Sequence, residues 1–134
     1  MKARPQRQTI LVVEDEPAVL LTYRMILEQH GYDVVTAASS VEAKRVLERQ
    51  NIDLLLCDLS LEERDTGFEV IASARQLRPA MPSVLLTGYA SKDVSDRARQ
   101  SGVAVLFKPI DIQEFLGTIT AHLRAVQQKK KRTG

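Results

Sequence analysis

The sequence predicts an α/β fold in which one parallel sheet carries helices on both faces. Two observations indicate this class. Short runs such as residues 10–13 and 54–57 are continuously apolar, as is typical of strands buried on both faces of a parallel sheet. Segments whose apolar residues recur at helical spacing alternate with these runs, and such alternation predicts strand–helix–strand units with right-handed crossovers.

Five strands and five helices are predicted in alternation, with no internal repeat, low-complexity tract or interdomain linker between them. The predicted strands are short apolar runs at residues 10–13, 34–35, 53–57, 84–86 and 103–107. The predicted helices have apolar positions at helical spacing and lie at residues 17–30, 41–50, 67–78, 92–100 and 111–126.

The residue types at the helix ends support these bounds. Pro17 suits the first turn of the first helix, and Gly31 is of the type that commonly follows a helix. Ser39 or Ser40 supplies a hydroxyl that can cap the second helix. The third helix begins at Gly67 and ends before a proline, which cannot continue a helix.

The fourth helix begins after Ser91 and is polar, with an apolar stripe that is little more than Val94 and Ala98. The last helix begins at Asp111. Five strand–helix units fit one of the two common orders of doubly wound sheets, the flavodoxin-like order 2-1-3-4-5. In that order the first and third strands are neighbours at the topological switch point, where ligands bind.

A chain of 134 residues that is 44% hydrophobic and 27% charged has the size and composition of one globular domain. No apolar run approaches the roughly 20 residues of a membrane-spanning helix, so we expect no membrane insertion. The N-terminus lacks the apolar segment of a signal peptide.

Cys57 is the single cysteine, which excludes an intrachain disulfide and favours a cytoplasmic location. Its thiol is expected to be a small core group.

The net charge of +2 conceals an uneven distribution. Residues 1–8 hold three basic and no acidic residues, and residues 129–132 are all basic, whereas residues 9–128 hold 12 basic and 17 acidic residues. We therefore predict a basic N-terminal tail over 1–8, a folded domain over 9–126 and a basic C-terminal tail over 127–134. Both tails are expected to be solvated and frayed rather than to bind nucleic acid.

Reactive polar side chains lie at the ends of four predicted strands. They are Glu14, Asp15, Asp58, Thr87 and Lys108. Because the carboxyl ends of parallel strands meet at one edge of a sheet, these groups are expected to lie together. Three neighbouring carboxylates repel one another and raise at least one pKa unless a hard cation such as Mg²⁺ is present. The set therefore suits a divalent metal plus a phosphoryl group.

Each residue also has an ordinary explanation when taken alone. Glu14 and Asp15 could be a solvated loop or acidic residues at a helix N-terminus, and Lys108 could simply end a strand. His30 and His122 are interpreted as structural or solvated residues. The occurrence of the reactive residues in order, at successive strand ends, is what indicates a site.

With these motifs the chain resembles the receiver domain of two-component response regulators, in its single-domain form. The resemblance covers residues 9–126. The matching segments are ILVVEDEP (10–17), CDL (57–59), GFEV (67–70), LTGYA (86–90) and FKP (107–109).

The resemblance implies that Asp58 accepts a phosphoryl group from a sensor histidine kinase or a histidine phosphotransfer protein. The Lys108 ammonium and Mg²⁺ would offset charge on the phosphoryl oxygens, and the Thr87 hydroxyl would bond the new phosphoryl group. The implied protein ligands of Mg²⁺ are Glu14 through water, Asp15, Asp58 and the backbone carbonyl of Ser60. The Lys108–Pro109 peptide bond is expected to be cis.

A receiver of this kind signals through protein–protein contacts with a downstream target. Its chemistry is confined to its own Mg²⁺-dependent phosphorylation and autodephosphorylation at Asp58, so it is not expected to be an enzyme in any wider sense. The family pattern implies no cofactor besides Mg²⁺.

Two departures from the family pattern concern the metal site. Glu62 stands where a proline is usual, and Gly67 lies nine residues beyond Asp58 instead of eight. The loop at 60–66 is therefore one residue longer and highly charged. Glu14 takes the place of the usual aspartate, which lengthens that side chain by one methylene.

A third departure concerns signal output. Val105 stands where the family often has a Tyr or Phe whose ring moves on activation. Tyr89, two residues after Thr87, is the nearby aromatic residue expected to respond instead. We expect the signal to leave through residues 88–101, because the helix there has the thinnest apolar stripe and is the easiest to shift.

Two other functions fit part of the pattern. An aspartate-nucleophile phosphatase also uses Asp, Mg²⁺, Thr or Ser, and Lys, but typically carries Asp-x-Asp at the nucleophile, and here Ser60 follows Asp58 by two residues. A receiver fold that binds partners independently of phosphorylation is the other alternative. The retained Asp58, Thr87 and Lys108 argue against it, whereas Val105 and the longer loop favour it.

Overall fold

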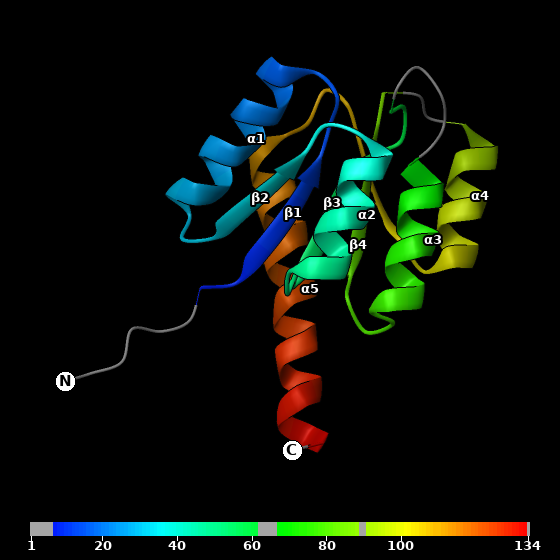
Figure 1. Ribbon diagram of the computed structural model, residues 1–134. Helices are drawn as coiled ribbons and strands as arrows, with labels where there is room; N and C mark the ends of the chain where they lie inside the picture. The colour runs from blue at the N-terminus through cyan, green and yellow to red at the C-terminus, as the bar shows by residue number, and fades with distance from the viewer. Residues whose placement is uncertain (1–6, 62–66, 89–90, 134) are drawn as a thin grey trace.

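The computed structural model describes residues 7–61, 67–88 and 91–133, with the backbone alone from residue 127 onward. Within these residues five strands alternate with five helices (Figure 1). The strands are Thr9–Val13 (β1), Asp33–Ala37 (β2), Leu54–Asp58 (β3), Ser83–Thr87 (β4) and Ala104–Phe107 (β5). The helices are Pro17–Gln29 (α1), Ser40–Arg49 (α2), Gly67–Leu77 (α3), Lys92–Ser101 (α4) and Ile112–Thr133 (α5).

The strands form one parallel sheet in the order β2-β1-β3-β4-β5, which confirms the predicted doubly wound fold. β1 lies between β2 and β3, and Val13 pairs with Ala37 on one side and with Cys57 on the other. The ends of β1 and β3 are therefore neighbours. This register is what brings the residues after Val13 next to Asp58.

The core consists of two layers of buried side chains, one on each face of the sheet. Alternate residues of β1 enter the two layers. Leu11 and Val13 pack in the layer that α2, α3 and α4 cover, whereas Ile10 and Val12 pack in the layer under α1 and α5 (Figure 1). A strand with apolar residues on both faces reads as a continuous hydrophobic run, which is why the pattern predicted the sheet.

The cap predicted at Ser39 or Ser40 is confirmed at Ser39, and Ser91 and Asp111, predicted as helix starts, are caps as well. The Ser39 hydroxyl accepts a hydrogen bond from the Glu42 amide, and the Ser91 hydroxyl accepts one from the Val94 amide, both at 3.1 Å. The Asp111 carboxylate accepts hydrogen bonds from two amides in the first turn of α5. Each cap satisfies backbone N–H groups that a helix leaves without a partner at its start.

The last helix was predicted to end at residue 126, before a basic C-terminal tail, and this helix end was wrong. α5 continues to Thr133. No proline or glycine follows Gly117 until residue 134, and Gln, Lys and Arg favour helix, so nothing in the sequence ends α5 at 126. None of the helices described here is long and apolar enough to span a membrane.

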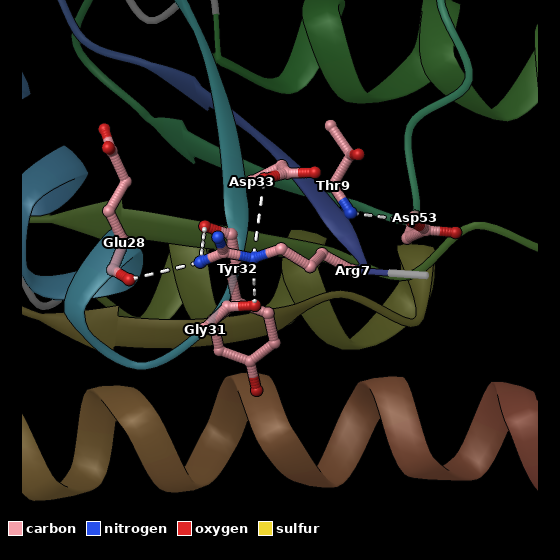
Figure 2. Close-up of polar contacts among 7 residues, drawn as sticks. All are labelled: Arg7, Thr9, Glu28, Gly31, Tyr32, Asp33 and Asp53. Carbon is pink, nitrogen blue, oxygen red and sulfur yellow. Dashed lines mark hydrogen bonds and ion pairs between the residues drawn. The ribbon is translucent and has the colours of Figure 1, made fainter. Parts of the chain in front are cut away.

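The N-terminal tail is also ordered where the structure describes it (Figure 2). The Arg7 guanidinium donates to the Gly31 carbonyl at 3.0 Å and lies 3.5 Å from the Asp33 carboxylate. It also donates to the carbonyl of Glu28 in the last turn of α1 and to that of Tyr32 just before β2, both at 3.4 Å. The Thr9 amide donates to the Asp53 carboxylate at 2.7 Å. The prediction of a frayed tail is therefore wrong for residues 7–8, and residues 1–6 lie outside the described part.

Gly67 is required where α3 begins. Its amide donates to the Leu59 carbonyl at 2.9 Å. A Cβ atom at this position would lie 2.5 Å from the Asp58 carbonyl oxygen and 2.7 Å from the Leu59 Cα, which is closer than backbone atoms allow. The start of α3 is thus in direct contact with the end of β3, and only glycine permits this contact.

Gly67→Ala is expected to lower the free energy of unfolding by about 1–3 kcal/mol, because the methyl group must displace the backbone of β3. Gly117→Ala is the matched control, because a Cβ atom there meets nothing within 4 Å. That change should raise stability by about 0.5–1 kcal/mol through the higher helix propensity of alanine. Urea unfolding of the two variants measures both effects, and equal stabilities would show that the contact at Gly67 is not tight.

Candidate functional site

The structure brings the three predicted carboxylates together at the carboxyl edge of the sheet. Glu14 and Asp15 directly follow β1, and Asp58 is the last residue of β3. One oxygen from each carboxylate lies within 4.8 Å of the others. Thr87 ends β4, the next strand along, and is buried. The strand order therefore produces the cluster that the sequence predicted.

Lys108, directly after β5, reaches across β4 to this cluster. Its ammonium nitrogen lies 2.9 Å from the Asp58 Oδ1 atom and 3.6 Å from the Glu14 Oε2 atom. The Lys108 amide donates to the Thr87 carbonyl at 2.7 Å, which fixes the backbone from which the side chain extends. The Lys108–Pro109 peptide bond is cis, as the family resemblance implied.

Burial makes this cluster electrostatically unusual. Glu14 is 1% exposed and Asp58 is 5% exposed. Burial, followed by the charge of Asp58, raises the pKa of Glu14 to about 7. Burial also raises the pKa of Asp58, although the hydrogen bond from Lys108 acts in the opposite direction. Burial alone would lower the pKa of Lys108, but its hydrogen bond to Asp58 and the charges of both acids outweigh burial and raise it.

The cluster has more buried negative charge than its one ammonium group neutralises. The Glu14 Oε2 atom has no hydrogen-bond partner among the described residues, although Lys108 lies 3.6 Å from it. The other oxygen of Glu14 accepts a long hydrogen bond of 3.4 Å from the Glu16 amide. Converging carboxylate oxygens, one of them a buried oxygen without a hydrogen-bond donor among the described residues, are the ligands that hard divalent cations prefer. The residues present therefore fit a metal ion.

Other predicted residues lie at or beyond this cluster. Ser60 is exposed and follows Asp58 by two residues, and its role as a carbonyl ligand stays a prediction. Val105 is partly buried and packs under α4. Tyr89 and Glu62 lie outside the described residues.

The remaining singled-out side chains have structural partners. The Cys57 thiol is fully buried, donates to the Asp58 carbonyl at 3.3 Å, and has its pKa raised by burial, so it is a core group as predicted. His30 and His122 each place Nδ1 within 2.9 Å of the carbonyl oxygen one turn earlier in their own helix. Neither histidine is part of the acidic cluster.

The sequence interpretation missed a groove beside the cluster. A cavity of about 550 Å³ lies between α1 and the start of α5, with Lys108 and Glu16 among its lining residues. The other lining residues are Ala18, Val19, Thr22, Tyr23, Ile26, Pro109, Ile110, Ile112 and Phe115. The spacing of Ala18, Thr22 and Ile26 on one stripe of α1 could have indicated this groove, but the same spacing equally indicates a stripe that faces the core.

The comparisons with known proteins agree with this geometry. A model of the response regulator receiver domain family matches residues 10–120. The chain belongs to this family. A solved CheY-like receiver domain protein from Methanospirillum hungatei JF-1 superimposes with a TM-score of 0.87 at 32% identity, over 92% of this chain and 99% of that one. The match places the chain among receiver domains rather than among the aspartate-nucleophile phosphatases that the sequence also allowed.

The proteins related to this receiver domain differ in length. The chain is 37% identical to the alginate biosynthesis transcriptional regulatory protein AlgB of Pseudomonas aeruginosa, over 93% of this chain but 30% of that protein. It is 35% identical to an uncharacterized 14.6 kDa protein of Leptolyngbya boryana, over 87% of this chain and 90% of that protein. The chain thus spans less than a third of the transcriptional regulator and nearly the whole of the smaller relative.

The raised pKa of Glu14 makes the stability of the metal-free protein depend on pH. Because this pKa rises from 4.5 to about 7 in the folded state, the folded state holds its proton more tightly than the unfolded state. In chelator, the free energy of unfolding should therefore fall as pH rises from about 4.5 to 7, by up to about 3 kcal/mol at 1.4 kcal/mol per pKa unit.

Glu14→Gln should flatten this dependence, and Mg²⁺ should restore stability to the wild type above pH 7. The exposed Glu48→Gln on α2 is the control and should keep the wild-type slope. Urea unfolding between pH 4.5 and 8, with chelator and with Mg²⁺, measures all three proteins. An equal slope in Glu14→Gln and wild type would show that Glu14 ionises normally.

Proposed function

We propose that this receiver domain takes a phosphoryl group from a sensor histidine kinase or a histidine phosphotransfer protein onto Asp58. The observation that carries the proposal is the 2.9 Å contact between the Lys108 ammonium and the Asp58 carboxylate inside a buried acidic cluster. A carboxylate that is held next to a fixed positive charge is oriented for attack on an electron-poor phosphorus. Phosphoryl transfer depends mainly on such positioning and charge neutralisation.

The proposed reaction is an in-line displacement. An oxygen of Asp58 forms a bond to phosphorus while the bond between phosphorus and the donor histidine nitrogen breaks, and that nitrogen keeps the electron pair. The product is an acyl phosphate on Asp58. Lys108 would then move its ammonium group from Asp58 toward a phosphoryl oxygen, and the Thr87 hydroxyl would donate a hydrogen bond to another.

Mg²⁺ is the metal proposed for the acidic cluster. Glu14, Asp15, Asp58 and the Ser60 carbonyl would hold it, and when bound it neutralises charge on the phosphoryl oxygens. Support comes from the three converging carboxylates and from the buried Glu14 oxygen that lacks a donor. The chemistry is confined to phosphorylation and autodephosphorylation of Asp58, so the domain acts on no external substrate.

The groove beside Lys108 is the proposed docking surface for the phosphoryl donor. It is lined mainly by apolar side chains of α1 and α5, and it includes Lys108, which also contacts Asp58. Leu21 and Met25, on the same helix as one wall of the groove, are more than half exposed. A donor that lies along α1 would bring its histidine to the cluster, and a cytoplasmic location follows for a domain that receives phosphoryl groups from such kinases.

We expect phosphorylation at Asp58 alone, and only with a divalent ion. Incubation with acetyl phosphate and Mg²⁺ should add one phosphoryl mass to the wild type and none to Asp58→Asn. Asp33→Asn, an exposed aspartate at the opposite edge of the sheet, is the control and should be labelled like the wild type. Intact-mass analysis reads out all three.

Two outcomes would contradict this assignment. One is the same added mass on Asp58→Asn, and the other is undiminished labelling of the wild type in excess chelator. A protein that adds no phosphoryl group under any condition, yet keeps its fold and binds partners, would instead be the phosphorylation-independent binding module.

Lys108→Ala removes the positive charge that contacts both acids. Mg²⁺ affinity should be unchanged or tighter, because a competing cation has gone, whereas labelling of Asp58 should slow by about 100-fold, the scale for loss of one group that stabilises developing charge. Lys44→Ala on α2 is the control, and Mg²⁺ titration and labelling rates are measured side by side. If both quantities match the wild type, Lys108 is only the end of a strand.

A further inference from the structure

Few buried side chains hold α4 to the domain. Its buried residues are Val94 and Ala98, both small. A further contact joins α4 to its neighbour α3: the guanidinium carbon of Arg97 lies 4.1 Å from the centroid of the Phe68 ring. The two helices lie side by side in Figure 1. A guanidinium group over an aromatic face is an attractive arrangement, so Arg97 helps to set where α4 lies relative to α3.

Phe68 is itself tied to the candidate phosphorylation site. It is 8% exposed and directly follows Gly67, whose backbone packs against the Asp58 carbonyl without room for a side chain. The Gly67 amide donates to the Leu59 carbonyl, and the Leu59 amide donates to β4 at the Leu86 carbonyl. The backbone from which the Phe68 side chain extends is therefore held against the backbone that follows Asp58.

α4 is tied to the same site by a separate route. β4 ends at Thr87, and α4 begins at Lys92 with Ser91 as its cap. Two segments of the backbone therefore run from the candidate site, one after Asp58 and one after Thr87. The two departing segments meet again at Phe68 and Arg97. The contact between these two side chains therefore joins the helix that follows Asp58 to the helix that follows Thr87.

We propose that the Phe68–Arg97 contact couples the position of α4 to the state of Asp58. The contact stabilises the arrangement of α3 and α4 described here, so it opposes any rearrangement that separates the two helices. The inference rests on the proposed function, because it needs a phosphoryl group on Asp58 to drive that rearrangement. Coupling between two sites is reciprocal, so weakening the contact must change how tightly the site binds a phosphoryl mimic.

The 134-residue chain is tested with beryllofluoride and Mg²⁺, which mimic a carboxylate-bound phosphoryl group. Arg97→Gln should bind beryllofluoride about two- to fivefold more tightly than the wild type, the range that corresponds to the strength of an exposed cation–π contact. Arg99→Gln is the matched control. It lies on the same helix, its side chain is 81% exposed, and its guanidinium lies 4.0 Å from the Asp96 carboxylate, so its affinity should equal that of the wild type.

A second variant separates coupling from a general loss of stability. Phe68→Leu removes the ring but keeps an apolar side chain, and it should tighten beryllofluoride binding in the same direction. The double variant should bind no more tightly than the stronger of the two single variants, because both remove one contact. Amide exchange over residues 91–101 should be faster in Arg97→Gln than in Arg99→Gln before the mimic is added.

The outcomes distinguish this inference from the proposed function. If the wild type binds no beryllofluoride with Mg²⁺ and Asp58 is not labelled, the proposed function fails. If the wild type binds the mimic but Arg97→Gln has the affinity of Arg99→Gln, or a weaker one, the coupling role of the contact is wrong and the proposed function stands. Additive effects of Phe68→Leu and Arg97→Gln on the affinity for beryllofluoride would also contradict the coupling role of the contact.

Discussion

The Lys108 ammonium beside the buried carboxylates of Asp58 and Glu14 is the interaction on which the site depends. Two carboxylates that are almost fully excluded from solvent repel each other, and burial raises the pKa of both. Lys108 offsets part of this cost, at 2.9 Å from one acid and 3.6 Å from the other. The negative charge that remains would favour a bound cation, and the proposed metal ion together with the lysine would make the cluster suitable for a phosphoryl group.

Much of this arrangement could be predicted from the sequence, because it follows from local rules. Ser39 and Ser91 cap helices through bonds to amides three residues ahead, and such bonds need no tertiary information. Continuous apolar runs predicted strands buried on both faces. Parallel pairing then placed the residues after β1 beside Asp58 at the end of β3, since neighbouring carboxyl ends share an edge. The cluster is thus a consequence of strand order and of which residue types follow each strand.

What could not be predicted depends on contacts between residues distant in the chain. Nothing near Arg7 indicates that its guanidinium meets the end of α1, so the N-terminal segment was expected to be frayed. The requirement for glycine at position 67 arises from backbone atoms of β3 that a spacing argument does not locate. The Phe68–Arg97 contact joins two helices whose facing depends on the packed sheet. The helical end of α5 is different: its residues favour helix locally, but the charge run suggested solvation instead.

The positions of the charged groups within the sheet have a mechanical consequence. Glu14 and Asp15 follow β1 and Asp58 ends β3, and both strands are hydrogen-bonded on both sides, whereas Lys108 follows β5, an edge strand that pairs with β4 alone. An interior strand is held by two ladders and an edge strand by one, so the negative groups are the stiff part of the site and the positive group is the compliant part. A charged group that enters the site would therefore be accommodated mainly by displacement of the Lys108 ammonium, while the Asp58 carboxylate keeps its position.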